Sequence, residues 1–188
     1  MNKHIDITDV VLTTDRLTLR PWKESDLKDL YEYASVDGVG QMAGWNPHRN
    51  IEESKEILSQ FINGKCVFAL EYQGKAIGSL GVHQYKEAQY PEFAEMTGLE
   101  IGYVLSKSYW GQGLMPEAVS AVIAWLFEEE KLDFILCGHF VWNRRSQRVI
   151  EKCGFRYIKT VGFETRYDTV ETCRDYILYH PERRNDIC

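Results

Sequence analysis

Hydrophobic and polar positions follow two different periods along this chain, and these periods predict its strands and helices. From Val11 to Leu19 apolar and polar residues alternate, which predicts a half-buried strand. In residues 25–35 and 51–62 the apolar positions recur three and four residues apart, which predicts two amphipathic helices with Ser25 and Asn50 as candidate N-caps. Further strands are expected at residues 66–72, 76–82, 99–106, 134–142, 155–163 and 173–180, and further helices at residues 116–130 and 143–153.

Glycines mark two boundaries in this pattern. Gly74, in the segment Gln73–Lys75, supplies the positive φ of a tight turn and predicts an antiparallel hairpin. Gly154 predicts the end of the helix that precedes it. The order of elements predicts an α/β (α+β) fold with a mixed, mostly antiparallel seven-stranded sheet flanked by helices. The 188 residues suit one domain, 1–188, with its core at about residues 12–180.

Composition narrows the class of protein. The net charge of −6, without a Lys/Arg cluster interleaved with aromatic residues, argues against nucleic acid as a partner. The most apolar run, AVSAVIAWLF, is far shorter than the roughly 18 residues of a membrane span. The cysteines are odd in number and never spaced as C-x-x-C, which favours a reducing cytoplasm and neither a disulfide framework nor a zinc site. They are Cys66, Cys137, Cys153, Cys173 and Cys188.

The stretch YWGQGLMPEA, residues 109–118, joins an expected strand to an expected helix through a loop with almost no side chains. Proline is favoured at the first helical position, so Pro116 predicts a helix that starts there with Met115 at the N-cap. Met115 has no side-chain oxygen with which to satisfy the free amides of the first turn. The N–H groups around Gly111 to Met115 therefore form a candidate anion site.

Other motifs give weaker signals. Residues 38–43, GVGQMA, match G-x-G-x-x-A but follow a helix rather than a strand, so the dinucleotide fingerprint lacks its context. His83 and His139 lie on expected strands, where packing is the simpler interpretation, and no paired spacing supports a metal. Cys153 is expected to be a core residue at a helix end.

The stretch WGQGLMPEA resembles the acetyl-CoA pyrophosphate loop of the GNAT acetyltransferase superfamily. TTDRLTLRPW and NRRSQRVIEKCGF resemble its Rim-type branch of ribosomal-protein N-terminal acetyltransferases, and the likeness covers about residues 12–180. Trp110 replaces the usual Gln or Arg of the loop motif, and Met115 replaces its final Gly or Ala. The resemblance implies a GNAT fold with splayed central strands and acetyl-CoA as cosubstrate.

The resemblance also implies how the cofactor binds. The edge of the strand at Tyr103 to Leu105 would pair with pantetheine, and the N–H of Val104 or Leu105 would polarise the thioester carbonyl. Asn143 and Ser146 would lie beside pantetheine and the thiol, although Asn143 also fits a simple helix cap with Ser146 at its third position. The expected cofactor-binding residues are Tyr103, Val104, Leu105, Trp110, Gly111, Gln112, Gly113, Leu114, Met115, Asn143 and Ser146.

Three residues are the catalytic candidates. Ser146 would protonate the departing thiolate, and Asn143 would position the cofactor. Glu100 is the candidate base, because the superfamily often places a glutamate on this strand. Glu100 lies five residues before Leu105, so a regular strand is expected to turn it away from the acceptor unless a bulge at Gly102 brings it back.

The acceptor is less well defined by the sequence. Residues 38–50 and 83–96 are expected to line its side, with Trp45, His48 and Tyr85 either shaping a pocket or packing. Gly154-Phe155 lacks the following glutamate of Rim-type enzymes, so peptide N-termini and small amines both stay open, as does a homodimer. The alternative to an N-acetyltransferase is a non-catalytic acyl-CoA-binding regulatory module.

Overall fold

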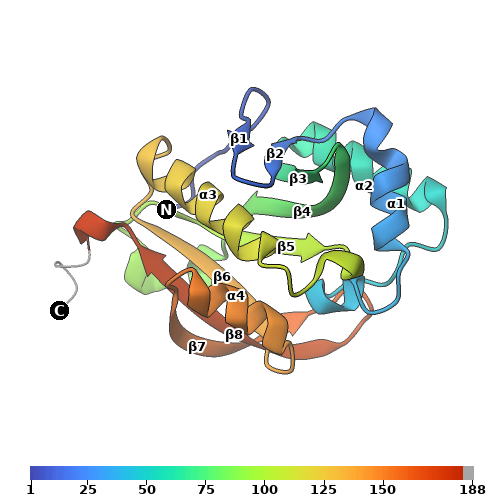
Figure 1. Ribbon diagram of the computed structural model, residues 1–188. Helices are drawn as coiled ribbons and strands as arrows, with labels where there is room; N and C mark the ends of the chain where they lie inside the picture. The colour runs from blue at the N-terminus through green and yellow to red at the C-terminus, as the bar shows by residue number, and fades with distance from the viewer. Residues whose placement is uncertain (184–188) are drawn as a thin grey trace.

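A mixed sheet forms the centre of the molecule. The computed structural model describes residues 1–183, and in this part of the chain the strands follow the order β1-β2-β3-β4-β5-β6-β8-β7 (Figure 1). Only β5 and β6 pair in parallel, and all other neighbours are antiparallel. The strands are β1 (Leu12–Thr13), β2 (Thr18–Pro21), β3 (Val67–Tyr72), β4 (Lys75–His83), β5 (Gly98–Leu105), β6 (Phe134–Phe140), β7 (Arg156–Glu164) and β8 (Val170–Tyr179).

The sheet has eight strands rather than the seven expected, because the first expected strand is folded back on itself. Thr14 donates its backbone N–H to the carbonyl of Leu17 at 2.9 Å, which closes a turn between β1 and β2. The two short strands then pair with Leu12 opposite Leu19. Thr and Asp residues in this segment favour such turns, and alternation alone does not distinguish one strand from two.

Helices cover both faces of the sheet. They are α1 (Leu27–Ala34), α2 (Ile51–Gly64), α3 (Leu114–Glu128) and α4 (Arg144–Lys152). Figure 1 shows α3 and α4 across the near face, with α2 behind the sheet. None of the helices in residues 1–183 has the length and apolar character that crossing a membrane requires.

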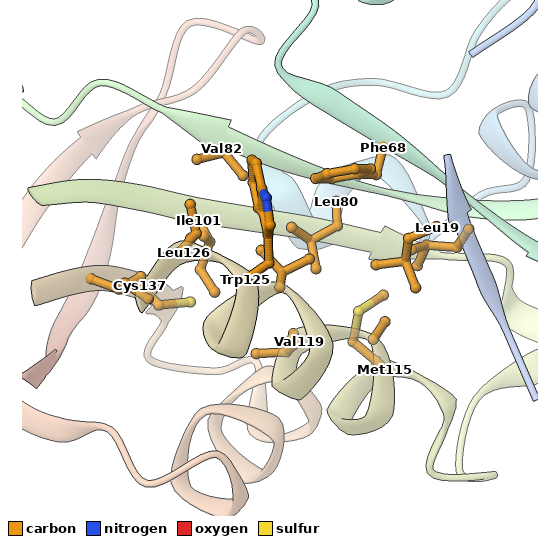
Figure 2. Close-up of a cluster of buried hydrophobic side chains, with 14 of the residues drawn as sticks. Leu19, Phe68, Leu80, Val82, Ile101, Met115, Val119, Trp125, Leu126 and Cys137 are labelled. Atoms are coloured by element: carbon orange, nitrogen blue, oxygen red, sulfur yellow. The ribbon is translucent and has the colours of Figure 1, made fainter. Parts of the chain in front are cut away.

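The larger core lies between α3 and the sheet. Figure 2 shows Met115, Val119 and Leu126 of α3 facing side chains of the sheet such as Leu80 and Ile101. Each fully buried side chain of this kind contributes roughly 1.5–3 kcal/mol to folding. This packing fixes the first turn of α3 against the end of β5.

The expected β3–β4 turn and the expected cap of α2 are found, whereas the expected cap of α1 is not. Gln73 and Gly74 both have positive φ, 51° and 80°, and join β3 to β4 as an antiparallel hairpin. Asn50 caps α2 by accepting the N–H of Glu53. Ser25, however, is not the cap of α1, because a short 3-10 turn (Glu24–Asp26) precedes the helix and Asp26 stands at the N-cap position.

The parallel strands β5 and β6 separate halfway along their length. Their pairing runs from Gly98↔Phe134 to Ile101↔Cys137 and ends there. Beyond that point β5 continues along β4 to Leu105, while β6 continues along β8 to Phe140. The edge of β5 that faces β6 is therefore unpaired after Ile101, which is the splay that the sequence resemblance implied.

Candidate active site

One cleft of about 1230 Å³ occupies the splay between β5 and β6. It extends from the loop before α3, past the open edge of β5 and the first turn of α4, to the opposite face of the sheet. There it is lined by the segment between α1 and α2 and by β7. The expected cofactor loop and the expected acceptor segments thus border one continuous space.

The loop before α3 leaves backbone amides free at the mouth of this cleft. Gly111 and Gly113 have φ of 77° and 78°, a left-handed conformation that favours glycine. The helix begins at Leu114 with Gly113 as N-cap, and no side chain caps it. The expected start at Pro116 with Met115 as cap is therefore wrong by two residues. Proline lacks only an amide that the first turn leaves free, so it is tolerated throughout that turn.

Arg16 braces the outer side of the loop. Its Nη1 donates to the carbonyl of Gln112 at 2.9 Å, and its Nε donates to Glu117 at 2.7 Å. Gln112 directs its side-chain amide to the carbonyl of Ser108 and does not line the cleft. Of the expected cofactor residues, Gln112 is thus the one that does not line the cleft.

Trp110 links the loop to both β5 and α4. Its Nε1 donates to the carbonyl of Leu105 at 2.8 Å. The guanidinium carbon of Arg145 lies 4.8 Å from the centroid of the Trp110 ring. Leu114 and Met115 are buried in the core, so only their backbone faces the cleft. Side chains here hold the loop in place and leave its amides exposed.

The backbone N–H groups of Val104 and Leu105 point to opposite edges of β5. Ser106 donates its N–H to the carbonyl of Ile77 on β4, at 2.7 Å. Backbone groups alternate between the two edges of a strand, so Val104 also points to β4. The N–H groups of Leu105 and Tyr103 then point into the splay. Of the two amides expected to polarise a thioester, only that of Leu105 faces the cleft.

Asn143 and Ser146 lie where α4 begins. The side-chain oxygen of Asn143 accepts the N–H of Ser146 at 3.2 Å, and its amide donates to the carbonyl of Met42 at 3.3 Å. Both ends of this buried side chain are used within the protein, so Asn143 acts as a helix cap and also ties α4 to the segment between α1 and α2. Ser146 lines the cleft at the first turn of α4.

Tyr103 brings a phenol to Ser146 that the sequence analysis did not identify. The two hydroxyls lie 2.9 Å apart, across the splay from β5 to α4. Burial raises the pKa of Tyr103 well above its ordinary value, so its hydroxyl keeps its proton. Helix α4 carries no tyrosine, and β5 supplies one beside Ser146. Only the pairing of distant elements reveals this contact.

Glu100 points into the cleft from a regular strand. The β4–β5 register is continuous from Gly78↔Leu105 to His83↔Glu100, with no bulge. Leu99 and Ile101 face the core, while Glu100 lines the cleft. The expectation that a regular strand turns Glu100 away is wrong. A backbone N–H lies in the plane of the sheet, so the spacing to Leu105 does not decide which face Glu100 occupies.

The surroundings of Glu100 disfavour its charge. Burial and the nearby Asp175 carboxylate raise its pKa to about 7, while Lys86 acts in the opposite direction. A carboxylate with a pKa near neutrality is well matched to accept a proton at physiological pH.

Asp175 and Tyr90 are residues that the sequence analysis missed. Asp175 lies on β8 and is 7% exposed, and its Oδ2 accepts the hydroxyl of Tyr90 at 2.5 Å. Both residues line the cleft. The available signal was an acidic residue inside the apolar run of the last strand, CRDYILY.

The expected acceptor segments contribute unequally. Trp45 and His48 line the cleft, and their rings pack 5.2 Å apart. Tyr85 instead packs on Phe134 in a separate aromatic cluster, so it does not shape the cleft. Phe163 of β7, which was not expected, adds to this wall.

The histidines and cysteines show no metal site. His83 lines the cleft as the cross-strand neighbour of Glu100, and His139 is buried with its ring near the hydroxyl of Tyr176. Cys153 packs partly buried against the core at the end of α4. Cys66, Cys137, Cys153 and Cys173 are free thiols, and Cys188 lies outside the described residues. Within residues 1–183, no three His, Cys, Asp or Glu side chains are grouped so as to hold a metal ion.

Comparison with known proteins gives consistent matches. Residues 16–156 match the acetyltransferase (GNAT) domain family. The uncharacterized N-acetyltransferase YoaA of Bacillus subtilis is 28% identical over 160 residues, which cover 78% of this chain and 82% of YoaA.

Two solved structures share the fold. The ribosomal-protein-S5-alanine acetyltransferase of Vibrio fischeri has a TM-score of 0.70 at 21% identity and covers 93% of this chain and 98% of its own. The microcin C7 self-immunity acetyltransferase MccE, solved with acetyl-CoA and AMP, has a TM-score of 0.74 at 18% identity. The match covers 88% of this chain and 93% of the MccE chain.

Proposed function

The chain belongs to the GNAT acetyltransferase family, and from that premise we propose that it transfers the acetyl group of acetyl-CoA directly to a primary amine in a ternary complex. One observation carries the proposal. A single cleft joins the bare loop before α3, the open edge of β5 and the Glu100 carboxylate. Donor and acceptor can therefore meet in one space without a covalent enzyme intermediate.

The cofactor would bind mainly through the backbone. The amides of residues 111–115 and the positive end of the α3 dipole suit a pyrophosphate. The unpaired edge of β5 at Tyr103 and Leu105 suits the amide groups of pantetheine, which would pair with it as an added strand. This arrangement directs the thioester toward Glu100 and Ser146.

The reaction removes two protons from the acceptor ammonium and adds one to the departing thiolate. Glu100 would take a proton from the acceptor ammonium, and the freed nitrogen lone pair would attack the thioester carbonyl. The Leu105 N–H would stabilise the oxyanion that forms. As the carbon–sulfur bond breaks, the thiolate would take a proton from Ser146, which Tyr103 can resupply through their 2.9 Å contact. The second amine proton would leave to solvent, Glu100 would release the proton it took, and solvent would return one proton to Tyr103. CoA thiol and an acetylated amine are then the products.

The pKa of Glu100 favours α-amines over lysine side chains. An α-amino group has an ordinary pKa of about 7.7–8.0, against about 10.4 for lysine. A base with a pKa of about 7 is close to the first value and more than three units from the second. We therefore propose peptide or protein N-termini as the better acceptors, with small amines of low pKa as alternatives. The likeness to the Vibrio fischeri ribosomal-protein acetyltransferase supports this order.

The test is an acceptor screen with two forms of the enzyme. Peptides with free N-termini, N-acetylated peptides that contain lysine, and small amines are incubated with acetyl-CoA, and acetylated product is detected by mass spectrometry. Glu100→Gln is expected to lower kcat/KM about a hundredfold at pH 7, with the deficit shrinking as pH approaches the pKa of the amine.

Two outcomes would contradict the proposal in different ways. Binding of acetyl-CoA without acetylation of any acceptor would identify a non-catalytic binding module. A Glu100→Gln enzyme with the full activity and pH profile of the wild type would remove Glu100 as the base and leave the family activity in place.

A further inference from the structure

Asp175 and Glu100 lie on β8 and β5, the two strands that flank β6, and both line the cleft. Glu100 lies opposite Leu136 on β6, and Asp175 lies opposite Gly138 on the other edge of β6. A Cβ on Gly138 would lie 2.9 Å from Oδ1 of Asp175, closer than real Cβ contacts come. The Asp175 carboxyl therefore lies over the bare backbone of Gly138, on the side of β6 that faces the cleft.

Tyr90 holds this carboxyl from the other side. Its hydroxyl donates to Oδ2 of Asp175 at 2.5 Å, in a site where Tyr90 is 6% exposed. The Tyr90 ring is fixed in turn, because it stacks on Phe93 and the ammonium of Lys159 lies 3.6 Å from its centroid. The orientation of Asp175 is thus set by packing and does not depend on a bound ligand.

We propose that Tyr90 and Asp175 form a positioning pair for Glu100: Tyr90 keeps the negative charge on Asp175, and that charge favours the protonated form of Glu100. The inference rests on the proposed role of Glu100 as base. Neither residue of the pair needs to touch the acceptor.

Groups on every neighbouring element act on these two carboxyls. Burial and the Asp175 charge raise the pKa of Glu100, and Lys86, after β4, lowers it. Burial also raises the pKa of Asp175, while Tyr90, Cys173 and Lys159 lower it. His83 on β4 and Cys137 on β6 complete the surroundings. His83 has a lowered pKa and is mostly neutral, and the buried Cys137 thiol keeps its proton because its pKa is raised.

The hydroxyl of Tyr90 makes the surroundings of the Asp175 and Glu100 carboxyls unequal. A hydrogen bond donated to a carboxylate favours its charged form. Asp175 receives such a bond, whereas the charged and polar groups acting on Glu100 include no comparable donor. Of two neighbouring acids, the one whose charge is better stabilised ionises at the lower pH. The geometry therefore makes Glu100 the stronger base of the two.

The experiment measures the protonation of Glu100 directly. Protein labelled with ¹³C at the glutamate side-chain carboxyl is titrated by NMR, and the Glu100 signal is assigned by its loss in Glu100→Gln. In the wild type the transition is expected near pH 7. Asp175→Asn is expected to lower it by about one unit or more, and Tyr90→Phe to lower it by less, because loss of the hydroxyl lets Asp175 take up the proton instead.

A matched control separates local from general effects. Asp168→Asn removes an exposed carboxylate on the β7–β8 turn, which is expected to leave the Glu100 transition in place. An unmoved transition in folded Asp175→Asn would overturn the proposal. An unmoved transition in Tyr90→Phe would remove Tyr90 from it, and this variant keeps the test open if Asp175→Asn fails to fold.

Activity gives a second, separable readout. The acid limb of kcat/KM against pH is expected to move with the NMR transition in both variants. If Glu100→Gln proves fully active, the assignment of the base fails. The NMR titration still decides whether Asp175 and Tyr90 control the proton on Glu100.

Discussion

An aspartate placed at Gly111 is predicted to abolish most cofactor affinity without unfolding the protein. Gly111 has a φ of 77° at the mouth of the cleft, and a Cβ built there would meet no atom within 4 Å. Gly74, in the β3–β4 turn, offers a matched control, because its φ is 80° and its Cβ position is equally open. Gly74→Asp carries the same strain and charge but lies outside the cleft.

The cost of backbone strain and the cost of repulsion between the new carboxylate and the phosphates can be worked out separately. A side chain at such a φ costs roughly 1–2 kcal/mol of unfolding free energy, and this cost applies to both variants. A carboxylate roughly 5 Å from one phosphate charge adds about 1 kcal/mol of repulsion in water and about 3 kcal/mol at the dielectric constant of a protein surface. Since 1.4 kcal/mol is tenfold, acetyl-CoA should bind Gly111→Asp about 5-fold to 140-fold more weakly.

Calorimetric titration with acetyl-CoA and thermal unfolding measure these two quantities. Gly111→Asp and Gly74→Asp should lose similar stability, whereas only Gly111→Asp should lose affinity. Added salt should recover part of the lost affinity, since screening weakens exposed repulsion. A folded Gly111→Asp protein that binds acetyl-CoA as tightly as the wild type would show that the phosphates do not bind at this loop.

Two further predictions concern the chemistry of the cleft. Ser146→Ala should lower kcat more than it raises KM for acetyl-CoA, whereas Asn143→Ala should lower the free energy of unfolding by about 1–2 kcal/mol through the lost cap. Steady-state kinetics measure the first effect and denaturant unfolding measures the second. A loss of stability alone in both variants would remove Ser146 from the mechanism. Burial raises the pKa of Glu100 from 4.5 to about 7, so its carboxylate opposes folding as pH rises through this window. Glu100→Gln should therefore be more stable than the wild type by about 2–3 kcal/mol at pH 8 and equally stable at pH 4, and equal stability at both pH values would show that Glu100 is not desolvated.

Local sequence signals located most elements because their causes lie within a few residues. The Gln73–Gly74 turn needs two positive φ angles, and Asn50 and Asn143 reach amides three residues ahead. Ser25 failed as a cap for a tertiary reason. Asp26 forms two hydrogen bonds to the guanidinium of Arg20 on β2, at 2.8 and 2.9 Å, which fixes the start of α1 one residue later.

The residues of the candidate site also fall into those that local sequence predicts and those that only the fold brings together. The candidate cofactor loop lies in one segment, so its glycines and the proline pointed to it even though the helix start was misplaced. Tyr103 was noted for its backbone, but its contact with Ser146 depends on how β5 and α4 are placed. Asp175 and Tyr90 lie 85 positions apart in the chain, and no periodicity or motif links them. Residues brought together only by the sheet order could not be found without it.

The carboxyl pair also bears on whether the chain is an enzyme or a binding module. A module that only held acetyl-CoA would need the loop and the edge of β5, and neither depends on a charge at Glu100. The structure nevertheless places Glu100 and Asp175 together in a partly buried cleft, where burial and the Asp175 charge raise the cost of charging Glu100. That cost serves no structural purpose, since a glutamine at position 100 would relieve it. A base tuned to accept a proton near neutrality accounts for it, and this favours catalysis over binding alone.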